Sequence, residues 1–167
     1  MSFSLVPRYS FCEIIDVSPG FLNRLGIKFL MVDLDNTLAS YRERTLSRNV
    51  SQWAAEIKES GIELFMVSNS RRKARIETFG KEFGTGFIMR ARKPSPKSLV
   101  QAMSIAGYEA GNSAFIGDQI FTDTIAANLA EVVSVIVRPK RLNNPVLALR
   151  YALEAPFRAM CRNKIRG

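Results

Sequence analysis

The stretch IKFLMVDLDNTL, residues 27–38, decides the fold of this chain. It begins as an apolar run of strand length, which predicts a buried β-strand over residues 27–34. Asp33, Asp35 and Thr37 follow at alternate positions where the run ends. Side chains at alternate positions of an extended segment lie on one side, so we expect these three polar groups to share a side, with a bend in the chain after Asp33.

Four more apolar runs follow, and amphipathic segments separate them. The runs predict strands over residues 62–67, 86–89, 113–116 and 132–137. The segments between them predict a helix from Thr45 or Ser47 to Gly61, one over 71–83, one from Ser95 and Pro96 to Gly107, and one over 120–129. This alternation predicts an α/β fold: a Rossmann-like, doubly wound, mainly parallel five-stranded sheet with helices on both faces.

The composition is that of a globular protein. Of the 167 residues, 47% are hydrophobic and 23% are charged. We expect residues 1–167 to form a single domain, with an apolar N-terminal flank (1–26) and a basic C-terminal flank (138–167). No apolar stretch approaches the roughly 20 residues that cross a bilayer, and the first residues lack a secretory signal. These features predict a cytoplasmic protein.

The residue types narrow the chemistry. There is no histidine, and the two cysteines, Cys12 and Cys161, lie near opposite ends of the chain. This pattern suggests neither a disulfide framework nor a structural zinc site. Catalysis would therefore use carboxylates, hydroxyls, lysines or a hard metal ion.

Four polar residues follow four of the predicted strands. They are Asp33, Ser68, Lys93 and Asp118, separated by 35, 25 and 25 residues. Ligands bind at the carboxyl ends of parallel strands, so we expect the four to meet at one edge of the sheet. Because Asp33 and Asp35 repel each other, a hard divalent cation is expected between them, with Asp118 and Asp123 as further carboxylates. Ser68 and Lys93 could then bind a phosphoryl group.

These residues resemble the four motifs of the haloacid dehalogenase superfamily of phosphohydrolases. The resemblance rests on Asp33-x-Asp35-x-Thr37, Ser68, Lys93, and Gly117-Asp118 with Asp123. Within the superfamily, the sequence is most similar to a cap-poor subgroup that includes phosphatidylglycerophosphate phosphatases. The similar stretches are VDLDNTL (32–38), RKP (92–94) and GDQIFTD (117–123).

The resemblance implies a role for each site residue. Asp33 would be the nucleophile that forms an aspartyl-phosphate, and Asp35 the general acid and then the base. Mg²⁺ would lie between Asp33, the main-chain carbonyl of Asp35, and Asp118, with Asp123 holding a metal-bound water or the loop. The group expected to bind or support the phosphoryl oxygens is Thr37, Ser68, Asn69 and Lys93.

Short intervals between the motifs bear on the substrate. Only 31 residues separate Thr37 from Ser68, and 25 separate Ser68 from Lys93, so no cap domain fits there. An open site suits a large or surface-held substrate. With the resemblance, this favours a Mg²⁺-dependent phosphomonoester hydrolase acting on phosphatidylglycerophosphate at a membrane surface. The alternatives are a soluble phosphatase of a sugar phosphate or nucleic-acid end, and a basic RNA- or ribosome-binding protein on a phosphatase scaffold.

Both flanks carry apolar residues, and the second is also basic. The formal net charge is +9, and residues 138–167 contain eight basic residues and only one acidic residue. After Asn144 and Pro145 the pattern predicts a helix with a kink or break before Pro156. Its apolar stripe is Val146, Leu149, Leu153, Phe157 and Met160, and Arg150, Arg158 and Arg162 lie on another face.

Two readings of the flanks stay open. Both apolar stripes, including the N-terminal Phe3, Leu5, Val6, Tyr9, Phe11, Ile14 and Ile15, could pack on the sheet, with the charges solvated. Alternatively, these surfaces could lie on anionic lipid at the inner face of a membrane. Nucleic acid is the less favoured partner.

Overall fold

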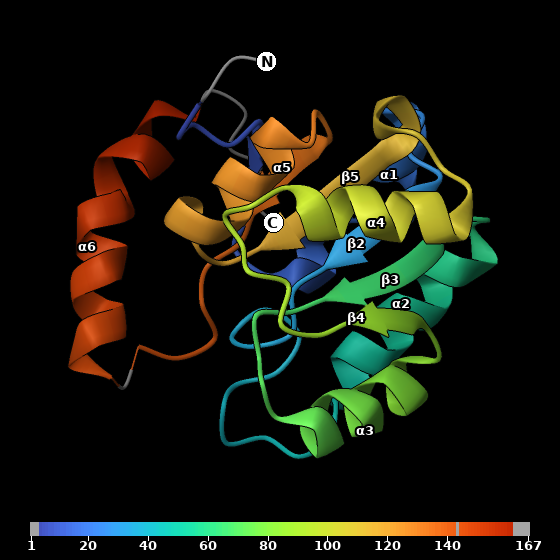
Figure 1. Cartoon of the computed structure of the whole chain (residues 1–167), viewed down its shortest axis with the longest axis horizontal. Coiled ribbons are helices and arrows are strands. Elements are labelled where there is room, and N and C mark those ends of the chain that lie inside the picture. The colour runs from blue at the N-terminus through green and yellow to red at the C-terminus, as the bar shows by residue number, and fades with distance from the viewer. Residues whose placement is uncertain (1–3, 143, 162–167) are drawn as a thin grey trace.

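The computed structural model describes residues 4–142 and 144–161, and it is built on a six-stranded sheet (Figure 1). The strands lie in the order β1-β6-β5-β2-β3-β4, and every neighbouring pair is parallel. They are β1 (Tyr9–Ser10), β2 (Phe29–Val32), β3 (Glu63–Val67), β4 (Gly86–Ile88), β5 (Ser113–Gly117) and β6 (Val133–Ile136).

Helices connect the strands and cover both faces of the sheet (Figure 1). The α-helices are α1 (Pro19–Arg24), α2 (Arg48–Glu59), α3 (Lys73–Phe83), α4 (Lys97–Ala106), α5 (Ile125–Leu129) and α6 (Pro145–Met160). Two 3₁₀ turns, η1 (Ile14–Asp16) and η2 (Ala110–Asn112), and one π-helical turn, η3 (Ile120–Thr124), complete the set. The predicted doubly wound α/β fold is confirmed.

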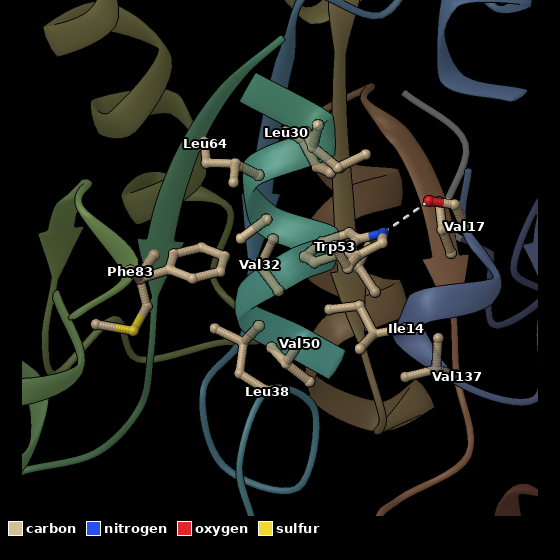
Figure 2. Close-up of a cluster of buried hydrophobic side chains, with 14 of the residues drawn as sticks. Ile14, Val17, Leu30, Val32, Leu38, Val50, Trp53, Leu64, Phe83 and Val137 are labelled. Carbon is tan, nitrogen blue, oxygen red and sulfur yellow. Dashed lines mark hydrogen bonds between the residues drawn. The ribbon is translucent and has the colours of Figure 1, made fainter. Parts of the chain in front are cut away.

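The alternating side chains of the strands build two cores, one on each face of the sheet. Leu30 and Val32 of β2 face α2, whose Trp53 donates a hydrogen bond from its indole to the carbonyl of Val17 (2.8 Å) (Figure 2). Phe29 and Met31 face the other way, toward a second cluster that α4 and α5 cover. Burial on both faces explains why β2 is a continuous apolar run in the sequence.

The sixth strand corrects the predicted count of five. Tyr9 and Ser10 pair with Val135 and Ile136 at the edge of the sheet. A strand of two residues is too short to produce a periodic pattern, so its existence depends on the partner strand. It belongs to the N-terminal flank, whose Phe11 and Ile14 are buried in the first core.

Several helices begin or end at the predicted capping residues, whereas other helix boundaries differ from the predicted ones. Ser47 caps α2 by accepting a hydrogen bond from the Val50 amide, which selects it over Thr45. The third predicted helix begins later than expected: α4 starts at Lys97, so Pro96 and not Ser95 holds the N-cap position. The segment 120–129 is divided between η3 and α5.

The C-terminal helix α6 packs with its apolar stripe outward. Asn144 caps it as predicted, but it continues through Pro156 to Met160, so the expected break is wrong. The side chains that remain exposed are Val146, Leu149, Leu153 and Met160, and Phe157 is half-buried. The stripe therefore does not pack on the sheet. Phe3, Arg162 and the basic residues after it lie outside the described residues.

The intervals around the second motif hold no inserted domain. Between β2 and β3 the described chain forms one loop and α2, and between β3 and β4 it forms one loop and α3. This agrees with the expected absence of a substantial cap. Of the described helices, none combines the length and the apolar character needed to span a bilayer.

Candidate active site

The centre of the site is the carboxyl end of β2. Asp33 follows this strand directly, and its amide donates to the carbonyl of Ile116 on β5 (2.9 Å). Ser68 follows β3 and Asp118 follows β5, the two strands that flank β2. The predicted meeting of these residues at one edge of the sheet therefore occurs.

Lys93 returns to the same edge although it follows β4, the outermost strand. The amide of Ala91 donates to the carbonyl of Ser68 (3.0 Å). Asn69 bonds the main chain of Lys93 twice, accepting from its amide (2.8 Å) and donating to its carbonyl (3.1 Å). The side chain of Asn69 thus positions Lys93, while its expected contact with phosphate stays a prediction.

The ammonium of Lys93 is buried between two carboxylates. Its Nζ lies 2.6 Å from Asp33 Oδ1 and 2.8 Å from Asp123 Oδ1, and it donates to the carbonyl of Val67 (3.1 Å). Phe115 lies beneath it, with 4.8 Å between Nζ and the ring centre. Burial alone would lower the pKa of Lys93, but the charges of Asp123 and Asp33 outweigh burial and raise it. Lys93 is therefore a fixed positive charge in the site.

Three buried carboxylates surround one point of the site. Oxygens of Asp33, Asp118 and Asp123 all lie within 4.8 Å of one another. Burial raises the pKa of Asp33 to about 7, with Lys93 lowering it and Asp123 raising it. Burial, together with Asp123 and Asp33, also raises the pKa of Asp118 well above its ordinary value. Ionisation of all three carboxylates is therefore unfavourable beside the single ammonium of Lys93.

This donor set fits a divalent cation. Hard cations such as Mg²⁺ prefer oxygen ligands and carboxylates, and a cation among Asp33, Asp118 and Asp123 would offset their repulsion. The side chain of Asp35 is not part of this cluster. The expected ligand atom of Asp35 is its main-chain carbonyl, and that contact stays a prediction.

After β2, Asp33 and Asp35 line the same cavity, as expected, whereas Thr37 does not line it. Asp35 points into the site and forms an ion pair with Arg75 of α3, with 3.1 Å between Nε and Oδ1. Asn36 has a φ of 65°, and this left-handed residue bends the chain. The hydroxyl of Thr37 then donates to Asp118 Oδ1 (3.3 Å). Thr37 thus supports Asp118, and its expected contact with phosphate stays a prediction.

Asp123 connects Lys93 to the loop that carries Asp118. Its second oxygen, Oδ2, accepts from the amide of Gln119 (3.0 Å). This arrangement requires glycine at 117, because a Cβ there would lie 2.4 Å from the Asp123 carboxylate carbon. The position of the Asp123 carboxylate therefore depends on the absence of a side chain at Gly117.

These residues open into a cavity of about 460 Å³, a volume typical of small-molecule sites. The predicted site residues that line it are Asp33, Asp35, Ser68, Asn69, Lys93 and Asp123. Asp118 and Thr37 lie behind this wall. The cavity is also lined by residues for which the sequence predicted no role in the site, namely Tyr41, Ser70, Arg71, Arg72, Gln119, Thr122 and Arg150.

Helix α6 stands beside the carboxyl ends of the strands and holds the Asp118 loop from outside (Figure 1). Glu154, which is 1% exposed, accepts from the amide of Phe121 (3.1 Å) and pairs with Arg158 (3.1 Å). Arg158 donates to the carbonyls of Asp118 and Val137. The spacing of the basic residues had indicated only a charged face, because the two carbonyls that Arg158 binds lie 40 and 21 residues away in the chain.

Comparisons with known proteins agree with this geometry. The model of the haloacid dehalogenase-like hydrolase family matches residues 15–131. The chain is also similar to the probable phosphatase YqeG of Bacillus subtilis, with 31% identity over 127 residues, covering 76% of this chain and 73% of that protein.

Solved structures share the fold at lower identity. A 3-deoxy-D-manno-octulosonate 8-phosphate phosphatase from Moraxella catarrhalis, in complex with magnesium, phosphate and its sugar acid, aligns with a TM-score of 0.52 at 16% identity, covering 84% of this chain and 93% of that chain. A hypothetical protein from Xanthomonas campestris aligns with a TM-score of 0.58 at 16% identity, covering 90% and 80%.

Proposed function

The chain belongs to the haloacid dehalogenase-like hydrolase family and is a phosphatase, and from this premise we propose that it hydrolyses phosphomonoesters through an aspartyl-phosphate on Asp33. The observation that carries the proposal is the position of Asp33. It lies in the cavity wall, where it contacts the ammonium of Lys93 and lies within 4.8 Å of two further buried carboxylates, and Asp35 and Ser68 line the same cavity.

In the proposed first step, one oxygen of Asp33 attacks phosphorus and the bond to the ester oxygen breaks. Asp33 Oδ1 already accepts from Lys93, which leaves Oδ2 as the attacking atom. The departing alkoxide takes a proton from Asp35, whose Oδ1 is held by Arg75. In the second step Asp35 removes a proton from water, the hydroxide attacks phosphorus, and the bond from phosphorus to Asp33 breaks.

Asp33, Asp118, Asp123 and the main-chain carbonyl of Asp35 would hold Mg²⁺. When bound, this ion would neutralise charge on the transferred phosphoryl group. Lys93 and Ser68 would bind the phosphoryl oxygens from the other side, since both line the cavity beside Asp33. Electrostatic stabilisation of this kind supplies most of the acceleration in phosphoryl transfer.

The test of the nucleophile is the variant Asp33→Asn. It keeps the size of the side chain and removes the attacking oxyanion, so we expect loss of turnover of para-nitrophenyl phosphate to below a thousandth of the wild-type rate. A control, Glu59→Gln, makes the same charge change on the exposed end of α2. Substantial steady-state activity of pure Asp33→Asn would exclude Asp33 as the nucleophile.

For the physiological substrate we propose phosphatidylglycerophosphate, met at an anionic membrane surface. Two features support this: the cavity has no cap over it among the described residues, and the exposed apolar stripe lies on α6, the helix whose Arg150 lines the cavity. Apolar and basic surfaces of this kind bind anionic lipid. Phosphate release should be highest with this lipid in a panel that also contains sugar phosphates and phosphorylated oligonucleotides, with and without Mg²⁺.

Membrane contact has a separate test. We expect the full chain to co-sediment with vesicles of phosphatidylglycerol and phosphatidylcholine, but not with phosphatidylcholine alone. Leu149→Gln with Leu153→Gln should weaken this binding, because both side chains are exposed on α6. If the chain co-sediments with neither kind of vesicle, the membrane proposal is wrong, and the protein would be a phosphatase of a non-lipid substrate.

A further inference from the structure

Three arginines line the cavity without a carboxylate partner among residues 4–142 and 144–161. Arg71 and Arg72 come from the loop between β3 and α3, and Arg150 comes from α6. The guanidinium of Arg150 donates to the side-chain carbonyl of Gln119, a neutral group. Neither Arg71 nor Arg72 forms an ion pair with a described residue, and both are exposed.

The other cations near the site are already neutralised by the protein. Lys93 lies between Asp33 and Asp123, Arg75 pairs with Asp35, and Arg158 pairs with Glu154. A transferred phosphoryl group bound at Asp33 would therefore occupy the paired part of the site. The unpaired positive charge of the cavity lies on Arg71, Arg72 and Arg150, which are more exposed than Lys93. The leaving group of a phosphomonoester would lie on this more exposed side of the cavity.

Tyr41 lines the same cavity as Asp35 and Arg150, and it is close enough to both for their charges to affect its pKa. Burial, with the nearby carboxylates, raises the pKa of Tyr41 to about 12, so its hydroxyl remains a neutral hydrogen-bond donor. A group bound by Arg150 would thus lie next to the reacting centre and not on a remote surface.

We propose that Arg71, Arg72 and Arg150 form a second anion subsite, which binds a phosphate or phosphodiester group carried by the leaving group of the substrate. This inference rests on the proposed phosphatase function and narrows its substrate class. Arginine suits the task because its planar guanidinium stays charged and bonds two phosphate oxygens at once. The cavity, at about 460 Å³, is large enough for a leaving group beside the phosphoryl group.

The test compares substrates that have one phosphate group with substrates whose leaving group carries a second one. One pair is fructose 1-phosphate and fructose 1,6-bisphosphate, and the other is glycerol 3-phosphate and a short-chain, soluble phosphatidylglycerophosphate. We expect the wild-type chain to show at least tenfold higher kcat/KM for the member with two phosphate groups in one pair, mainly through KM. The pair that shows the larger preference identifies whether the second group is a phosphomonoester or a diester.

Arg71→Gln and Arg150→Gln should each reduce this preference about tenfold. Arg24→Gln is the matched control, because Arg24 is exposed on α1, at the opposite ends of the strands. A preference that survives in the double variant Arg71→Gln with Arg150→Gln would overturn the subsite, as would the absence of any preference in the wild type. Hydrolysis of para-nitrophenyl phosphate separates the subsite proposal from the proposed phosphatase function. If the wild-type chain does not hydrolyse it, the phosphatase function is contradicted and not the subsite alone.

Calorimetry gives a second measurement that does not depend on turnover. The two-phosphate member of the preferred pair is titrated into Asp33→Asn, and into the same variant with Arg150→Gln. The subsite predicts about tenfold weaker binding in the second protein and no such difference for the one-phosphate member of that pair. Equal affinities in the two proteins would contradict the subsite.

Discussion

At the scale of single residues, the site is built from side chains that are fixed by one another. Asp123 touches Lys93 with one oxygen and the amide of Gln119 with the other. Thr37 supports Asp118, and Asn69 fixes the main chain of Lys93. Because each group has a second partner, small displacements should be costly in activity.

Gly117→Ala tests this directly. The added Cβ would lie 2.4 Å from the Asp123 carboxylate, so Asp123 must move and Lys93 would lose one of its two carboxylate partners. We expect kcat/KM for para-nitrophenyl phosphate to fall by about tenfold to a hundredfold. Circular dichroism should show that the variant still folds.

Gly111→Ala is the control for that substitution. A Cβ at Gly111 meets no atom within 4 Å, so its activity should match that of the wild type. If Gly117→Ala were as active as Gly111→Ala, the position of Asp123 would not matter for catalysis.

At the scale of elements, α6 is held by its charged face. Glu154 and Arg158 are buried against the Asp118 loop, whereas Leu149 and Leu153 are 63% and 58% exposed. Glu154→Ala should destabilise the fold by about 3 kcal/mol, because it leaves Arg158 without its buried partner. Leu153→Gln should change stability by less than about 0.5 kcal/mol.

Urea denaturation of the two variants measures this difference. Both changes lie on the same helix and introduce good helix formers, so differences in helix propensity are small beside the expected effect of about 3 kcal/mol. A larger loss of stability in Leu153→Gln than in Glu154→Ala would mean that the apolar stripe is covered and that the described packing of α6 is wrong.

The elements also show what could be predicted from the sequence. The run at residues 27–34 and the other strands followed by helices were predictable, because burial on both faces produces long apolar runs. The positions of Asp33, Ser68 and Asp118 followed from parallel strands that end at one edge. Lys93 reaches the same edge only through a loop whose hydrogen bonds no local pattern predicts.

Other features depend on partners that are far away in the chain. The two-residue strand β1 exists because β6 pairs with it. Arg75 reaches Asp35 across 40 residues, and Arg158 reaches the Asp118 carbonyl across the same separation. The outward apolar stripe of α6 follows from these contacts, since hydrophobic periodicity alone finds a stripe without telling which way it faces.

At the scale of the whole molecule, the buried carboxylates couple metal binding to stability. Without a cation, Asp33, Asp118 and Asp123 repel one another with only Lys93 between them. Mg²⁺ at a hundredfold over its Kd should stabilise the folded chain by about 2.7 kcal/mol. That corresponds to a melting temperature about 5–10 °C higher for a protein of this size.

Asp118→Asn should remove most of the stabilisation by Mg²⁺ when the two proteins are compared at pH 8. It removes one buried charge and keeps an oxygen for Thr37, so the metal-free variant should melt above the metal-free wild type and gain little from Mg²⁺. Differential scanning fluorimetry measures both effects, and Glu59→Gln controls for the loss of a surface charge. An undiminished gain from Mg²⁺ in Asp118→Asn would exclude Asp118 as a ligand.

Because Lys93 is buried, the reactivity of its amine should show whether the site around it is folded. Its side chain is 1% exposed and held by two carboxylates, whereas Lys28, Lys73 and Lys97 face solvent. Amine-reactive reagents that modify the outer lysines should therefore pass over Lys93 for as long as the fold stays closed around it. Mass spectrometry of a partly acetylated sample would thus show from one peptide whether the proposed catalytic centre is intact, with no substrate present.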